Sequence, residues 1–153
     1  MGTAPVRTGR AERLRAPLLV ALWCLLGVDA AGGLAIFFAR LAWGTTPAVA
    51  VHVWVGLALA ATYTAYQIGH WSRVSPFRAR LDYALGLVAA LTLTATLVTG
   101  LVLALPWWRA RASGQPVAYP PLLSAVHNIG SMLVLTFVGA HLGAVLWRDR
   151  GRR

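Results

Sequence analysis

Cysteine, acidic residues and lysine are scarce or missing in this chain of 153 residues. Cys24 is the single cysteine, which excludes an intramolecular disulfide and any zinc or iron–sulfur site built from cysteines alone. The sequence also contains no phosphate-binding loop, nucleophile–base pair, zinc signature or nucleic-acid module. All 14 basic residues are arginine, and only four acidic residues oppose them: Glu12, Asp29, Asp82 and Asp149.

Apolar residues, in contrast, are abundant. They make up 58% of the chain, and the mean hydropathy is +0.65, whereas a soluble domain of this size needs far more polar surface. A helix needs about 20 apolar residues to cross a bilayer. We therefore expect an all-α bundle of four transmembrane helices, from Pro17 to Leu41, Pro47 to Trp71, Asp82 to Leu105 and Pro121 to Trp147.

Several residues predict where these spans begin and end. Pro47 and Pro121 are expected in the first turns of the second and fourth helices, where proline is tolerated. Asp82 is expected to cap the start of the third helix. The segment from Arg109 to Pro120 is predicted to be the longest connection and to form turns on the outer side.

The arginines are divided unevenly between the two ends of the predicted bundle. A net charge of +10 can indicate nucleic-acid binding, but these arginines stand just outside apolar runs, which favours a topological role. The positive-inside rule predicts that both termini lie in the cytoplasm. We expect the membrane itself to be an inner (plasma) membrane of bacterial type. Eleven arginines are on the cytoplasmic side (7, 10, 13, 15, 73, 78, 80, 148, 150, 152, 153) and three on the other (40, 109, 111).

The predicted organisation is an Arg-rich N-terminal segment (1–16), a transmembrane domain (17–147) and a basic tail (148–153). Residues 7–30 also have the layout of a secretory signal peptide, with a basic start, an apolar stretch and small residues at 28–30. The apolar run resumes from Leu34 to Phe38, which favours a span that is not cleaved.

The four histidines form two pairs on two of the predicted spans. His52 and His70 are 18 residues apart, and His127 and His141 are 14 apart. At about 100° per residue, 18 positions return a side chain to the same face of a helix, and 14 positions miss it by only about 40°. Each pair therefore lies along one face of its helix. Because ionisable side chains are costly at membrane depth, these faces are the candidate functional sites.

Topology decides which histidines meet. The second and fourth spans run in the same direction, so His52 and His127 share one level (the outer pair) and His70 and His141 share another (the inner pair). The levels are about 27 Å apart on the second span and about 21 Å apart on the fourth. Two such pairs suit two six-coordinate metals, and we expect two b-type haems with all four histidines as axial iron ligands.

Other residues are expected to support these ligands. The second ring nitrogen of each histidine should donate to a backbone carbonyl or a hydroxyl, for which Thr62, Thr64 and Ser131 are candidates. On the third span, Gly86 and Gly100 are 14 residues apart and match the inner and outer levels. A glycine there would let a flat macrocycle approach the backbone, although small-residue helix packing explains either glycine alone.

The segments around the histidines resemble the b-type cytochromes that hold two haems in a four-helix membrane bundle. Relevant relatives are the N-terminal half of respiratory cytochrome b and the cytochrome b subunits of formate dehydrogenases and hydrogenases. The resemblance implies that the four histidines are axial ligands and that Gly86 and Gly100 contact haem. It extends over nearly the whole chain from the first span onward, and its motifs are HVWVG (52–56), GHW (69–71), HNIG (127–130) and HLG (141–143).

The chain departs from that family at the inner pair. The family pattern places the second ligand of the second span at position 66, which is Tyr66 here. His70 lies one turn further along, so its level differs from that of His141 by about 6 Å. Two alternatives stay open: Tyr66 as a ligand of the inner iron, and His70 as an interfacial hydrogen-bonding residue beside Trp71 and Arg73.

The expected function is transmembrane electron transfer between a partner on one face and the quinone pool or a second partner on the other. The sequence shows no soluble domain, so we expect a subunit or partner of a larger redox complex rather than a stand-alone enzyme. Two alternatives are a non-haem subunit that anchors an assembly and a membrane protein that handles copper or zinc. Asp29, near mid-bilayer, is either part of a proton relay or quinone site, or a hydrogen-bonded residue beside Gly27, Gly32 and Gly33.

Overall fold

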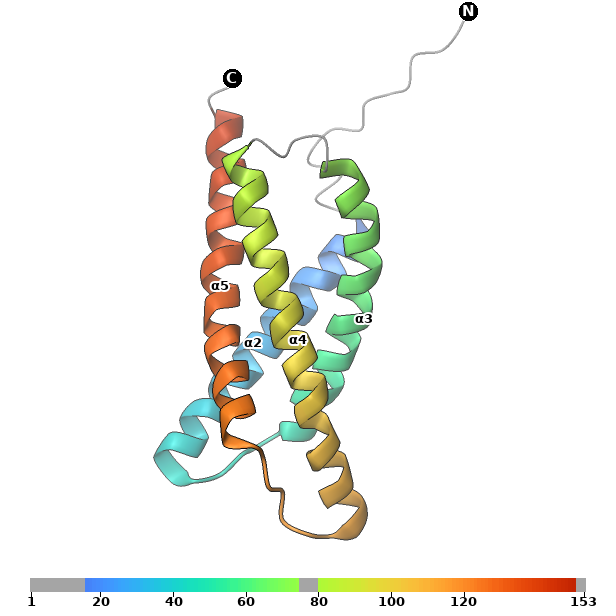
Figure 1. Ribbon diagram of the computed structural model, residues 1–153, viewed down its shortest axis with the longest axis vertical. Helices are drawn as coiled ribbons and strands as arrows, with labels where there is room; N and C mark the ends of the chain where they lie inside the picture. Colours follow the sequence, from blue (N-terminus) through green and yellow to red (C-terminus); the bar gives the residue numbers. More distant parts are fainter. Residues whose placement is uncertain (1–15, 75–79, 151–153) are drawn as a thin grey trace, which may run out of the picture.

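The computed structural model describes residues 16–74 and 80–150. Residues 1–15 of the predicted N-terminal segment, Arg78, and residues 151–153 of the basic tail lie outside this part of the chain. The described residues form four helices and no strand, and each helix is long and apolar enough to cross a membrane. The predicted all-α bundle of four transmembrane helices is confirmed: α2 (Pro17–Trp43), α3 (Val49–Val74), α4 (Leu81–Ser113) and α5 (Pro121–Arg150) (Figure 1).

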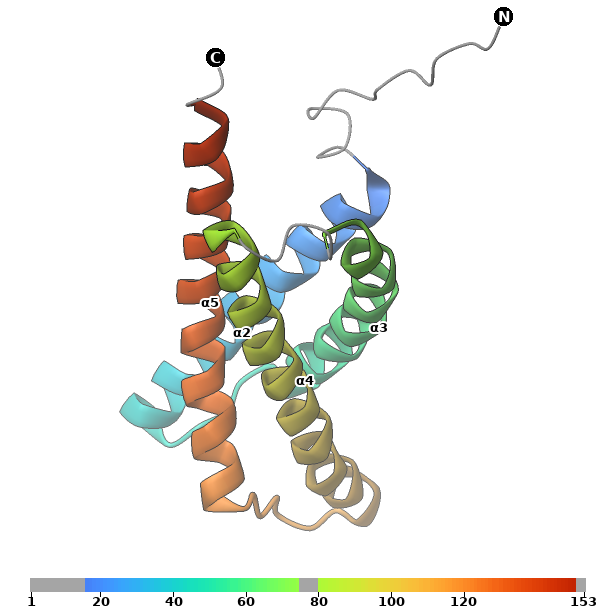
Figure 2. The ribbon, with the colours of Figure 1, turned by 45° about the horizontal axis from the view of Figure 1, so that its top comes forward.

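The helices are arranged as two close pairs. α2 packs along α3 and α4 packs along α5, while the contact between α3 and α4 is less extensive. α3, α4 and α5 follow the long axis of the molecule, and α2 crosses behind them obliquely (Figure 1). The first turn of α2 and the last turn of α5 lie at the same end of the bundle, where α3 and α5 diverge (Figure 2). Because the two helix pairs pack less extensively against each other, there is room between them inside the bundle.

The helix ends agree with the sequence predictions at some positions and not at others. Pro121 begins α5, as expected, but α3 begins at Val49, so Pro47 lies in the preceding turn rather than in the helix. The predicted cap position is also wrong, because Arg80 is the N-cap of α4 and Asp82 lies in the first turn. The largest difference is that α4 continues through Pro106 to Ser113, which shortens the predicted connection.

Glycine terminates two of the helices. Gly44 after α2 and Gly114 after α4 have φ angles of 67° and 68°, in the left-handed region where a side chain would be strained. The N–H of Gly44 also donates to the carbonyl of Arg40 at 3.0 Å, which satisfies one of the free carbonyls at the helix end. These two turns lie at the end of the bundle opposite the first turn of α2 and the last turn of α5 (Figure 1).

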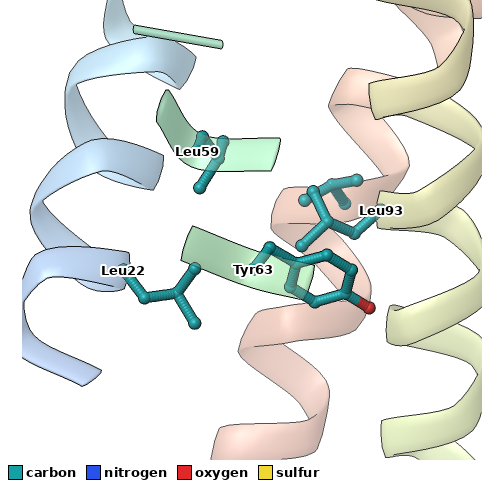
Figure 3. Close-up of a cluster of buried hydrophobic side chains, with 5 residues drawn as sticks. Leu22, Leu59, Tyr63 and Leu93 are labelled. Carbon is teal, nitrogen blue, oxygen red and sulfur yellow. The ribbon is translucent and has the colours of Figure 1, made fainter. Parts of the chain in front are cut away.

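A small apolar core fills the middle of the bundle (Figure 3). Leu59 of α3 is only 1% exposed, and the Tyr63 hydroxyl, one turn later, donates to the carbonyl of Ala90 on α4 at 3.2 Å. Along α3 these residues come between His52 and His70, so the core separates the outer and inner levels. All four helices contribute to it: Leu22, Leu59, Tyr63, Leu93 and Val134.

The outward surface of the helices is largely apolar. Large side chains such as Leu122 and Trp147 are more than three-quarters exposed, as suits lipid contact. The hydroxyls of many serines and threonines bond to carbonyls of their own helices, so they are satisfied without water. The chain is therefore a multi-pass membrane protein whose outer surface contacts lipid.

Candidate functional site

The outer histidine pair is brought together between α3 and α5. The ring centres of His52 and His127 are 6.3 Å apart, and their planes are inclined by 70°. Both rings line a cavity of about 210 Å³ whose lining includes residues from all four helices. The pairing expected from helix direction and periodicity thus places two imidazoles across one internal space.

The orientation of His127 follows from α4. Its Nδ1 lies 3.0 Å from the backbone carbonyl of Thr96 and 3.2 Å from the hydroxyl of Thr99. A carbonyl oxygen can only accept a hydrogen bond, so Nδ1 carries the proton and the lone pair is on Nε2. This is the tautomer in which a histidine binds a metal through Nε2.

His52 is oriented by a carboxylate instead. Its Nδ1 lies 2.9 Å from Oδ1 of Asp29 on α2, a contact at ion-pair distance, and neither of these buried atoms has a hydrogen-bonding partner among the described residues. Asp29 is thus paired with a histidine, and its carboxylate lies against Gly56 of α3, whereas Gly33 of α2 lies against the His52 ring. A role of Asp29 in a proton relay or quinone site stays a prediction. The contact leaves Nε2 of His52 available.

The inner histidines have separate neighbours. Nδ1 of His141 lies 2.8 Å from the backbone carbonyl of Asp82 on α4, the same arrangement as for His127. His70 stacks on Tyr66, with ring centres 5.0 Å apart, and its Nδ1 lies 3.0 Å from the Tyr66 hydroxyl. Within residues 16–74 and 80–150 there is no ring contact between His70 and His141. The outer pair is assembled in this structure, and the inner pair is not.

Gly86 and Gly100 lie directly against the histidines of α5. A Cβ atom added to Gly100 would be 2.9 Å from Cε1 of His127, and one added to Gly86 would be 2.8 Å from Cε1 of His141. The matching spacing of 14 residues on these antiparallel helices reflects these two contacts. Each glycine makes room for an imidazole, and its contact with haem stays a prediction.

The hydroxyl partners predicted for the histidines are wrong. Thr62, Thr64 and Ser131 donate to carbonyls one turn earlier on their own helices. The expectation of a backbone carbonyl is confirmed for His127 and His141, but the residues that supply it, Thr96 and Asp82, could not be identified, because backbone carbonyls leave no signature in a sequence. The pairing of Asp29 with His52 does have a signal in the sequence, because in an antiparallel hairpin the spacing of Asp29 to Gly33 matches the spacing of His52 to Gly56.

Polar residues also line the cavity toward the connections opposite the termini. Arg40 of α2, and Tyr119 between α4 and α5, both contribute to the lining. Partial burial raises the pKa of Tyr119 above its ordinary value of 10.0, and the charge of Arg40 opposes that shift. A neutral phenol and a guanidinium at one end of the cavity can bind an acidic group.

The donor set suits a haem iron. An imidazole nitrogen lies about 2.0–2.1 Å from a bound metal ion, so two rings on opposite sides of one ion have centres about 6 Å apart. The outer pair has this separation, with both Nδ1 atoms engaged elsewhere. The described residues contain no group of three or more His, Cys, Asp or Glu side chains arranged to hold a metal ion. No family model, curated protein or solved structure matches the chain.

Proposed function

We propose that this chain is an integral membrane b-type cytochrome that carries electrons across the bilayer through two bis-histidine haems. It serves as a subunit or partner of a quinone-linked redox complex. The observation that carries the proposal is the outer pair: the imidazoles of His52 and His127 line one cavity with their ring centres 6.3 Å apart, and Nδ1 of each ring contacts a residue of a neighbouring helix.

His52 and His127 would hold the outer haem. When bound, haem supplies reversible one-electron chemistry, and two axial imidazoles favour electron transfer over oxygen binding. The residues of the chain supply position and exclude water. Thr96 and Asp29 would hold the rings in place, and apolar side chains from α2 to α5 make up much of the cavity lining. Arg40 and Tyr119 would bind the acidic propionates at the polar end of the cavity.

His70 and His141 would hold the inner haem. The orientation of His141 by the Asp82 carbonyl leaves its Nε2 available, as at the outer level. For His70 to serve as the partner, its ring must leave Tyr66 and α3 must approach α5 at the end where they diverge. Tyr66 itself is the alternative ligand from α3. The inner haem therefore depends on a rearrangement that the outer haem does not need.

The direction of the chain in the membrane is part of the proposal. Arg80, Arg148 and Arg150 lie at the end of the bundle where α2 begins and α5 ends, and Arg40, Arg109 and Arg111 lie at the opposite end (Figure 1). Together with the arginines in residues 1–15 and at position 78, this distribution favours termini in the cytoplasm of a bacterial-type cell. The outer haem would then lie near the outer leaflet and the inner haem near the cytoplasm.

The proposal is tested by the spectrum and metal content of the purified full-length chain. It predicts a reduced-minus-oxidised spectrum of low-spin b-type haem, with about two haems per chain. One haem per chain would restrict the site to the outer pair. A purified chain that carries copper or zinc without haem, or neither metal nor haem, would reject the cytochrome in favour of a metal-handling or anchoring protein.

A further inference from the structure

At the contact between Asp29 of α2 and His52 of α3, each helix provides a polar side chain and a glycine that makes room for the polar side chain of the other helix. Asp29 and Gly33 are one turn apart on α2, and His52 and Gly56 are one turn apart on α3. The His52 ring lies over Gly33, where an added Cβ would be 3.2 Å from Cε1. The Asp29 carboxylate lies over Gly56, where an added Cβ would be 3.7 Å from Oδ1. Each polar side chain thus occupies space left by a glycine on the other helix.

Among the described residues, His52 is the only histidine that contacts a carboxylate. His127 and His141 contact backbone carbonyls of α4, and His70 contacts the Tyr66 hydroxyl. The carbonyl partners of His127 and His141 are neutral, whereas Asp29 can carry a full negative charge. The two proposed ligands of the outer site therefore differ in the partner of Nδ1: His52 on α3 contacts a carboxylate, and His127 on α5 contacts a neutral carbonyl.

The position of the Asp29 carboxylate within the membrane-spanning part of α2 calls for a physical explanation. Burying a charged side chain within a membrane is costly, and such residues are typically functional. Holding α2 against α3 does not require it, since the two helices are already joined by a short connection and packed along their length. A carboxylate behind a metal-binding imidazole fixes the ring and makes it a stronger electron donor to the metal.

We infer that Asp29 is a positioning residue for His52 that lowers the midpoint potential of the outer haem. The inference rests on the proposed cytochrome function. Asp29 touches neither iron nor porphyrin in this scheme and acts only through the imidazole. Stronger donation from His52 stabilises the ferric state, so the outer haem is a weaker oxidant than it would be with a neutral partner at position 29.

The test is a redox titration of the full-length Asp29→Asn variant, which measures the midpoint potential of each haem. The outer haem is identified as the one that is missing from the His127→Ala variant. Asparagine keeps the size of the side chain and an oxygen that can face Nδ1, but it removes the charge. We expect haem content to be retained, the midpoint potential of the outer haem to shift positive, and its near-infrared charge-transfer band to move. Unchanged potential and band in a haem-loaded variant would overturn the inference while leaving the cytochrome proposal intact.

Asp82→Asn is the matched control. It removes the same charge at the inner level, from a residue whose carboxylate pairs with Arg148 and whose backbone carbonyl, which the substitution keeps, contacts His141. The outer haem should keep its potential in this variant, and an equal shift would overturn the specific role of Asp29. If Asp29→Asn does not assemble, the inference is tested instead by the position of the near-infrared charge-transfer band of the outer haem in the unaltered protein. A position typical of carboxylate-supported imidazole supports the inference, and a position typical of neutral imidazole overturns it. Absence of haem from the unaltered chain rejects the proposed function itself.

Discussion

His127 fits into the space that Gly100 leaves on α4. A Cβ atom at position 100 would lie 2.9 Å from Cε1 of the imidazole, closer than two carbon atoms can approach without movement. Because the Thr96 carbonyl holds Nδ1 of the same ring, His127 cannot turn aside without losing its hydrogen bond. The ring orientation thus depends on a residue that has no side chain.

Gly100→Ala should therefore displace His127 and weaken the outer haem site. We expect a loss of about 1–3 kcal/mol in the free energy of unfolding, the usual effect of inserting a methyl group into a packed contact. The haem content should fall by the outer haem alone, measured as haem per chain after purification. Gly139→Ala on α5 is the control, because an added Cβ there meets no atom within 4 Å and should change neither quantity.

Gly130 and Thr96 form a second close contact between α4 and α5. A Cβ at Gly130 would lie 2.6 Å from the Thr96 hydroxyl oxygen, a buried atom with no hydrogen-bonding partner in the described part of the chain. Gly130→Ala should lower the thermal unfolding midpoint in detergent, with a cost of about 1–3 kcal/mol. Adding Thr96→Ala should restore most of it, since the obstructing oxygen is removed. Additive losses in the double variant would show that this contact is not the cause.

The sequence predicted the fold well because each span is long, apolar and bounded by arginine or proline. The end of α4 was missed because Pro106 and the polar residues after Trp108 resemble a loop, although the helix continues to Ser113. Helical periodicity and direction placed His52 opposite His127. They could not show that His70 stacks on Tyr66, because that local contact depends on where α3 and α5 diverge.

The orientation of the chain can be tested with single cysteines in a Cys24→Ser background. Ser113 ends α4 and Ser72 lies near the end of α3, at opposite ends of the bundle. Because the arginines are expected to keep the Ser72 end in the cytoplasm, Ser113→Cys should react with a membrane-impermeant maleimide on intact cells. Ser72→Cys should react only after the cells are opened. The reverse pattern would place the termini outside.

The contact between His70 and Tyr66 at the inner level predicts the effect of removing the Tyr66 hydroxyl. Tyr66→Phe deletes the hydroxyl that faces Nδ1 of His70 but keeps the stacked ring. If His70 is the inner ligand, both haems should remain and the inner haem should keep the spectrum of bis-histidine ligation. Loss of the inner haem in Tyr66→Phe, together with its retention in His70→Ala, would assign the ligand to Tyr66.

The most direct test of the account is the haem content of His52→Ala, His127→Ala and the variant that combines them. Since both rings are proposed to hold one iron, each single variant should lose the same single haem, and the combined variant should lose no more. Replacing His52 together with His141 should remove both haems. Undiminished haem in either single variant, or the loss of a second haem when His52 and His127 are replaced together, would contradict the shared site.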